Sequence, residues 1–149
     1  MCFPAGSVES QTAVTGVSGC LTVLTKRRQR FFEDPRIAEI CVTQVRRAAD
    51  QSCFRIRAGT VMPDHMHLLV EGRTAVADLI AFVKLAKQLS GYHAKRLTGR
   101  KVWSDGYHER ILRHHEDPQR YVEYILLNPV KGRLVDAIGV HPYTWVDDQ

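Results

Sequence analysis

Two histidines lie two residues apart in the apolar segment 61–70. Because successive side chains of a β-strand point to opposite faces, His65 and His67 would share one face of a strand. The alternate positions of the same strand are apolar and consist of Met66, Leu68 and Val70. Imidazole pairs at this spacing suit a divalent metal ion. The segment therefore predicts a strand that packs on a core with one face and presents two metal ligands on the other.

A second group of polar side chains lies in segment 121–130, where the periodicity predicts a helix. At about 100° per residue, Tyr121, Tyr124 and Asn128 fall on one face of that helix and aliphatic side chains on another. Tyr124 and Asn128 are one turn apart, so they can act at one site. An amide oxygen is a suitable ligand for a hard divalent ion. We expect a helix that docks through its aliphatic stripe and presents a phenol beside a metal ligand.

A metal held by two imidazoles and an amide oxygen, with a phenol beside it, suits cleavage of a phosphodiester. The metal would act as a Lewis acid on a non-bridging oxygen and orient the scissile bond. The phenol of Tyr124 would attack phosphorus and become covalently linked. Because a phenol is mostly protonated at neutral pH, it needs activation by the metal or by a base. The bond energy would be conserved in the phosphotyrosine, so strands could be rejoined without ATP.

Length and composition are those of one globular domain, with 149 residues of which 44% are hydrophobic and 25% charged. The net charge of +5 favours an anionic partner, most simply nucleic acid. The sequence shows neither a bilayer-spanning apolar run nor a signal peptide, so we expect a cytoplasmic, nucleoid-associated protein. Residues 1–18 lack periodicity and are predicted to form a flexible arm, and residues 19–149 a single catalytic domain.

Periodicity along the chain predicts an α+β fold. Strands are expected over residues 21–25, 54–62, 65–71 and 109–113. Helices are expected over 35–49 after an N-cap at Asp34, over 75–97, and from the Asp117-Pro118 cap to about residue 128. The last helix should end near Asn128, because a residue before proline disfavours helical geometry. The order strand, helix, strand, strand, helix, strand is that of a ferredoxin-like βαββαβ sandwich with an antiparallel sheet. The extra C-terminal helix carries the tyrosine, and the sheet face of His65 and His67 is left for chemistry.

Several basic side chains are candidate DNA contacts, and for each the alternative is an ordinary solvated charge. They are Arg27, Arg28, Arg55, Arg57, Lys84 and Lys87. The two arginines at 55 and 57 would point away from an apolar face made by Phe54, Ile56 and Ala58.

Three aromatic or polar residues have competing interpretations. Tyr121 is a second candidate nucleophile beside Tyr124. Asn128 could be a helix C-cap before Pro129, a role in which asparagine is common. Trp103 could stack on unpaired bases or belong to the core.

Taken together, the two motifs resemble the single-tyrosine transposases. Segment 61–70 looks like the His-hydrophobic-His motif of that family, and Tyr124-Ile125 with Asn128-Pro129-Val130 looks like the tyrosine helix of its REP-associated branch. Trp103, Gly106-Tyr107 and Ile111-Leu112-Arg113 are similar to the segment before that helix, and Lys84 lies where the family usually carries a helix lysine. The resemblance covers roughly residues 19 to 146.

This resemblance implies a ferredoxin-like fold, a divalent metal ion such as magnesium or manganese, and single-stranded DNA, often with a hairpin, as substrate. It makes His65 and His67 metal ligands and Tyr124 the nucleophile, and it puts Asn128 where insertion-sequence relatives have a glutamine ligand. The implied function is metal-dependent cleavage and rejoining of single-stranded DNA through a phosphotyrosine, that is, DNA transposition. Relatives include dimers and monomers, so the assembly is left open.

Two other functions fit the same residues. One is a domesticated module that binds DNA hairpins without cleaving them. The other is an unrelated hydrolase in which a metal on His65 and His67 activates water. Tyr124 and Asn128 favour the transposase over the binding module, and the lack of further His, Asp or Glu ligands near the histidine pair in the sequence disfavours the hydrolase.

Overall fold

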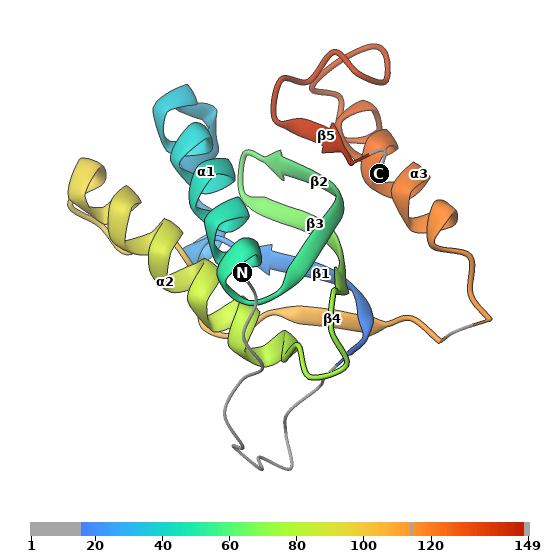
Figure 1. Cartoon of the computed structure of the whole chain (residues 1–149). Helices are drawn as coiled ribbons and strands as arrows, with labels where there is room; N and C mark the ends of the chain where they lie inside the picture. The colour runs from blue at the N-terminus through green and yellow to red at the C-terminus, as the bar shows by residue number, and fades with distance from the viewer. Residues whose placement is uncertain (1–15, 114, 148–149) are drawn as a thin grey trace.

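The computed structural model describes residues 16–113 and 115–147 of the chain. Strands and helices alternate along this part (Figure 1), as β1 (Ser18–Leu24), α1 (Pro35–Gln51), β2 (Phe54–Met62), β3 (His65–Gly72), α2 (Leu79–Thr98), β4 (His108–Ile111), α3 (Pro118–Lys131) and β5 (Thr144–Val146). Two single 3-10 turns, η1 (Lys26–Arg28) and η2 (Phe31–Glu33), connect β1 to α1.

The strands form one antiparallel sheet in the order β4-β1-β3-β2-β5. The first four strands have the order of the ferredoxin-like sandwich, so the predicted fold is confirmed. The short strand β5 was not predicted. Its three residues pair with β2, and three residues are too few for a period-two pattern to reveal.

Helices α1 and α2 lie side by side on one face of the sheet, and α3 lies on the opposite side (Figure 1). The core under α1 and α2 includes Met66, Leu68 and Val70 of β3, each at most 1% exposed. Burying a side chain of this size stabilises the fold by about 2 kcal/mol. The apolar face of β3 is therefore used as the alternation predicts, and the face with the two histidines is turned toward α3.

Strand β2 departs from its predicted pattern at a bulge. The pairing with β3 shifts between Ile56 and Ala58, which makes Arg57 an extra residue. Phe54 and Ile56 face the α1–α2 layer, as predicted. Ala58 does not share their face but packs in the smaller core beneath α3, because the extra residue reverses the alternation. An unbroken alternation cannot anticipate such an insertion.

The end of α3 also corrects the sequence prediction. The helix continues past Asn128 and includes Pro129, which is buried. The carbonyls of Asn128 and Pro129 accept hydrogen bonds from the backbone N–H groups of Gly132 and Leu134, both at 2.9 Å. Proline removes one N–H donor, but packing of its ring and these later bonds maintain the last turn. The interpretation of Asn128 as a C-cap is therefore wrong.

Two other element boundaries follow from side-chain caps and edge contacts. Helix α2 begins at Leu79 and not near residue 75, because the Asp78 carboxylate accepts hydrogen bonds from the first-turn N–H groups of Ile80 and Ala81. Residues 1–15 of the expected N-terminal arm lie outside the described residues, whereas the Gly16 N–H donates to the Ala77 carbonyl at 2.9 Å.

No helix in ranges 16–113 and 115–147 is long and apolar enough to span a membrane.

Candidate active site

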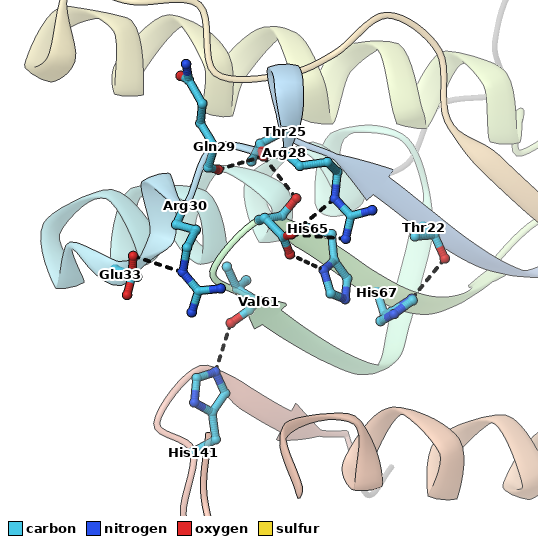
Figure 2. A network of polar contacts seen from close by, with 11 residues as sticks. Thr22, Thr25, Arg28, Gln29, Arg30, Glu33, Val61, His65, His67 and His141 are labelled. Atoms are coloured by element: carbon cyan, nitrogen blue, oxygen red, sulfur yellow. Dashed lines mark hydrogen bonds and ion pairs between the residues drawn. The ribbon is translucent and has the colours of Figure 1, made fainter. Parts of the chain in front are cut away.

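The turn between β2 and β3 places the two histidines at the start of β3. Pro63 and Asp64 form this turn, and His65 and His67 follow on the sheet face toward α3. Their ring centroids lie 4.7 Å apart with the planes at 80° (Figure 2). The strand thus holds two imidazoles edge to face.

His67 is the more buried of the two and is held from the neighbouring strand. His67 is 7% exposed, and its Nδ1 lies 2.9 Å from the hydroxyl oxygen of Thr22 on β1 (Figure 2). Burial, together with the nearby His65 ring, lowers the pKa of His67 to about 4. The ring is therefore neutral at physiological pH, which is the state that binds metal ions.

His65 is held by an acidic residue next to it. Its Nδ1 lies 2.7 Å from Asp64 Oδ1. The other carboxylate oxygen accepts a hydrogen bond from Arg28 Nε at 3.1 Å and forms an ion pair with Arg28 Nη2 at 3.0 Å. Burial raises the pKa of Asp64, but the contacts with His65 and Arg28 outweigh it and leave the pKa below its usual value. Asp64 is therefore an anion that can orient an imidazole and increase its basicity.

The donor set at this site suits a divalent metal ion. Hydrogen bonds with Thr22 and Asp64 occupy the Nδ1 atoms of His67 and His65. Nε2 is therefore the atom of each ring that is left to bind a metal ion. Among the described residues, no group of three or more His, Cys, Asp or Glu side chains could hold a metal. An ion bound by the two rings would need oxygen ligands from Asn128, substrate or water, and so would keep positions open for substrate.

Helix α3 docks over the histidine face through Val122 and Ile125, which pack on Ala58, Leu69 and Leu112. The Asp117 carboxylate caps its first turn by accepting a hydrogen bond from the Gln119 N–H at 2.9 Å. The segment after α3 returns to the hairpin formed by β2 and β3, where His141 Nε2 lies 2.8 Å from the Val61 carbonyl oxygen (Figure 2). The aliphatic contacts and this return segment together position the helix over the histidine face.

Tyr124 lies beside the histidine pair of its own chain. Its ring centroid is 5.8 Å from that of His67, and the Lys131 amine lies 5.8 Å from the same tyrosine ring. The residue is 47% exposed, and its hydroxyl has no hydrogen-bond partner among the described residues. Tyr124 thus combines proximity to the candidate metal ligands with an accessible hydroxyl.

Tyr121 has a different environment. Its hydroxyl accepts a hydrogen bond from Arg110 Nε at 2.5 Å and donates one to Glu116 Oε2 at 2.7 Å. These contacts connect the first turn of α3 to β4. Both hydrogen bonds of the Tyr121 hydroxyl stabilise the fold, which favours Tyr124 as the nucleophile.

Of the candidate DNA contacts on the strands and the β1–α1 connection, Arg28 lies at this site, through Asp64. Arg28 holds Asp64, and Arg55 pairs with Glu71 and Asp147 at 3.2 and 2.8 Å. Arg57 lies 3.6 Å from Glu71. These contacts give the three arginines structural partners, and Arg27 remains exposed.

The two lysines of α2 lie in the helical layer on the other side of the sheet. Lys84 is exposed, whereas the Lys87 amine donates hydrogen bonds to the Ser104 and Gly106 carbonyls, both at 2.8 Å. Trp103 is 3% exposed and its indole N–H donates to the Ser90 hydroxyl, so it belongs to the core and does not stack on bases.

Sequence reasoning missed Thr22, Asp64 and Arg28 as supports of the histidines. Asp64 adjoins His65 in the chain, and a carboxylate beside a candidate metal ligand is a usable signal. Thr22 carries no such signal, because its place opposite His67 depends on the register of β1 and β3.

Comparison with known proteins gives concordant matches. The family model described as "Transposase IS200 like" matches residues 14–126. A Haemophilus influenzae protein named as a REP-associated tyrosine transposase is 29% identical over 137 residues, which cover 82% of this chain and 74% of that protein. The REP-associated tyrosine transposase of Escherichia coli is 32% identical over 94 residues, 61% of this chain and 53% of the relative.

Two solved structures share the fold. One is a REP-associated tyrosine transposase bound to a REP hairpin, with a TM-score of 0.74 and 21% identity over 93% of this chain and 81% of that one. The other is a protein from Deinococcus radiodurans described as a transposase, with a TM-score of 0.58 and 24% identity over 78% of this chain and 95% of that one.

Proposed function

Because this chain belongs to the family of IS200-like transposases, we propose that it cleaves and rejoins single-stranded DNA through a covalent bond to Tyr124. The observation that carries the proposal is the position of Tyr124, 5.8 Å between ring centroids from His67 and open to solvent. We propose a hairpin-forming strand as substrate, by analogy with the solved relative that is bound to a REP hairpin.

In this mechanism the Tyr124 oxygen attacks the scissile phosphorus and forms a phosphotyrosine. The phenol gives up its proton, the bond between phosphorus and a sugar oxygen breaks, and the leaving sugar oxygen takes up a proton and becomes a hydroxyl. Rejoining is the reverse step, in which a sugar hydroxyl attacks the phosphotyrosine and returns the tyrosine oxygen as a leaving group. The number of phosphoester bonds is conserved throughout, so no nucleotide cofactor is consumed.

His65 and His67 would hold a divalent ion through Nε2, with Asn128 as a proposed oxygen ligand one helical turn from the nucleophile. Bound there, magnesium or manganese would supply Lewis-acid stabilisation of charge on the phosphate. Asp64 and Thr22 would keep both rings in orientation, and Lys131 would add positive charge beside the phenol.

A covalent-adduct assay tests this proposal. Purified protein is incubated with labelled single-stranded DNA from the flanks of its own gene in manganese or magnesium and analysed on denaturing gels. We expect a shifted band that disappears in Tyr124→Phe and in His65→Ala. Tyr92→Phe is the matched control, because Tyr92 is an exposed tyrosine of α2 on the other layer and should leave the band unchanged.

The absence of an adduct from wild-type protein that still binds the hairpin in a mobility-shift assay would contradict strand transfer. That result would identify the chain as a hairpin-binding module. Turnover of DNA that survives Tyr124→Phe would instead point to a hydrolase that uses water.

A further inference from the structure

A cavity of about 1070 Å³ lies between β4 and α3, next to the site described above. Thr22 and Tyr124 are among its lining residues, so the cavity adjoins the candidate nucleophile. Its volume lies slightly above the usual range for ligand-binding pockets. Any strand joined to a phosphate at Tyr124 would have this space beside it.

Charged side chains of both signs line the cavity. Of the three acidic ones, Glu116 contacts Arg110 and Tyr121, Asp117 accepts a hydrogen bond from the first turn of α3, and Glu109 is hydrogen-bonded to Tyr107. Arg113 and Arg120 also line the cavity. Both are exposed, and neither makes a side-chain ion pair among the described residues. Two guanidinium groups are thus available for an anionic ligand.

The same cavity has apolar walls. Cys20 of β1 and Ile111 of β4 line it, and both are half-buried. The Tyr121 ring lines it as well, and the hydrogen bonds of the Tyr121 hydroxyl with Arg110 and Glu116 hold this ring in place. A fixed aromatic ring beside free cations is the combination that binds unpaired bases and their phosphates.

We propose that this cavity holds the single-stranded nucleotides next to the scissile phosphate, with Arg113 and Arg120 contacting their phosphates and the Tyr121 ring stacking on a base. The inference rests on the proposed function, because it assigns the path of the DNA strand at the Tyr124 site. It makes Arg113, Arg120 and Tyr121 substrate-binding residues and leaves the chemistry to Tyr124.

Binding measurements in the Tyr124→Phe background test the proposal without covalent capture. The probes are a fluorescein-labelled DNA hairpin from the flank of the gene, with and without a single-stranded extension, followed by anisotropy. We expect Arg113→Gln with Arg120→Gln to weaken binding of the extended probe about tenfold and to leave the bare hairpin unchanged. The salt slope for the extended probe should fall by about 1.4, since each single-strand phosphate contact contributes about 0.7.

The matched control removes two exposed charges from the other layer of the molecule. Arg47→Gln with Lys95→Gln changes the net charge equally, but on α1 and α2, and should leave both probes unaffected. Equal weakening of both probes, or equal weakening by the control, would overturn the proposal in favour of a general charge effect.

A second measurement locates the strand. In the Cys2→Ser variant, Cys20 is the half-buried thiol while Cys41 and Cys53 are buried. The extended probe should slow alkylation of Cys20 severalfold, and the bare hairpin should not. Unchanged alkylation at saturating extended probe would place the strand elsewhere.

Failure of this inference differs from failure of the proposed function. If wild type forms the adduct but the arginine variants bind like the control, the cavity assignment alone is wrong. If wild type binds the extended probe through the two arginines without forming an adduct, strand transfer alone is wrong.

Discussion

The Thr22 hydroxyl oxygen of β1 lies 2.9 Å from Nδ1 of His67 on β3, where the two residues are register partners. This contact occupies the ring nitrogen that faces β1, and so leaves Nε2 on the side of the ring away from Thr22. A neighbouring strand thereby determines which nitrogen of His67 is available for a metal ion.

Replacing Thr22 with valine should therefore weaken metal binding without unfolding the protein. Valine keeps the β-branched shape but cannot hold Nδ1, so we expect about a tenfold loss of manganese affinity in calorimetry. Thr43→Val, at an exposed position of α1, is the control and should bind like wild type. Wild-type affinity in Thr22→Val would show that His67 needs no such partner.

Asp64→Asn should reduce metal affinity by about 10- to 100-fold, because a neutral amide orients His65 and increases its basicity less than a carboxylate does. Arg28→Gln should give a smaller loss in the same direction, since Arg28 acts on His65 only through Asp64. Asp136→Asn removes an exposed carboxylate elsewhere and controls for net charge. A larger effect from Arg28 than from Asp64 would contradict this order.

Tyr121→Phe should separate the two tyrosines of α3. It removes the hydroxyl that joins Arg110 and Glu116 but keeps the ring, so the covalent adduct should still form. Thermal unfolding should show that the free energy of unfolding falls by about 1 kcal/mol, the usual net contribution of one hydrogen bond. Loss of the adduct in Tyr121→Phe with normal DNA binding would make Tyr121 the nucleophile.

The metal-free protein should lose stability as the pH falls from about 6.5 toward 4. Burial lowers the pKa of His67 from 6.5 to about 4, so the unfolded chain binds a proton in this window while the folded chain does not. The loss should reach about 3 kcal/mol near pH 4. Urea unfolding with a chelator measures it. The dependence of the free energy of unfolding on pH should flatten in His67→Gln. It should persist in His108→Gln, which removes an exposed imidazole. An equal pH dependence in both variants would rule out His67 as the source.

Local periodicity was sufficient for the parts of the site that depend on near neighbours in the chain. Side chains alternate along a strand, so His65 and His67 had to share a face once β3 formed. A helical repeat likewise brings Tyr124 and Asn128 within one turn of each other. The same rules predicted the ferredoxin-like order of strands and helices, because each element carries its own pattern.

The sequence by itself therefore determined the element order, the paired imidazoles and the face of the tyrosine helix. Only the tertiary structure decided that α3 covers the histidine face, that Thr22 meets His67 across 45 residues, and that Tyr121 is bound to Arg110 and Glu116. It also decided the bulge at Arg57 and the continuation of α3 through Pro129. The physical reason is that these features depend on strand register and on packing between distant segments, which no local repeat encodes.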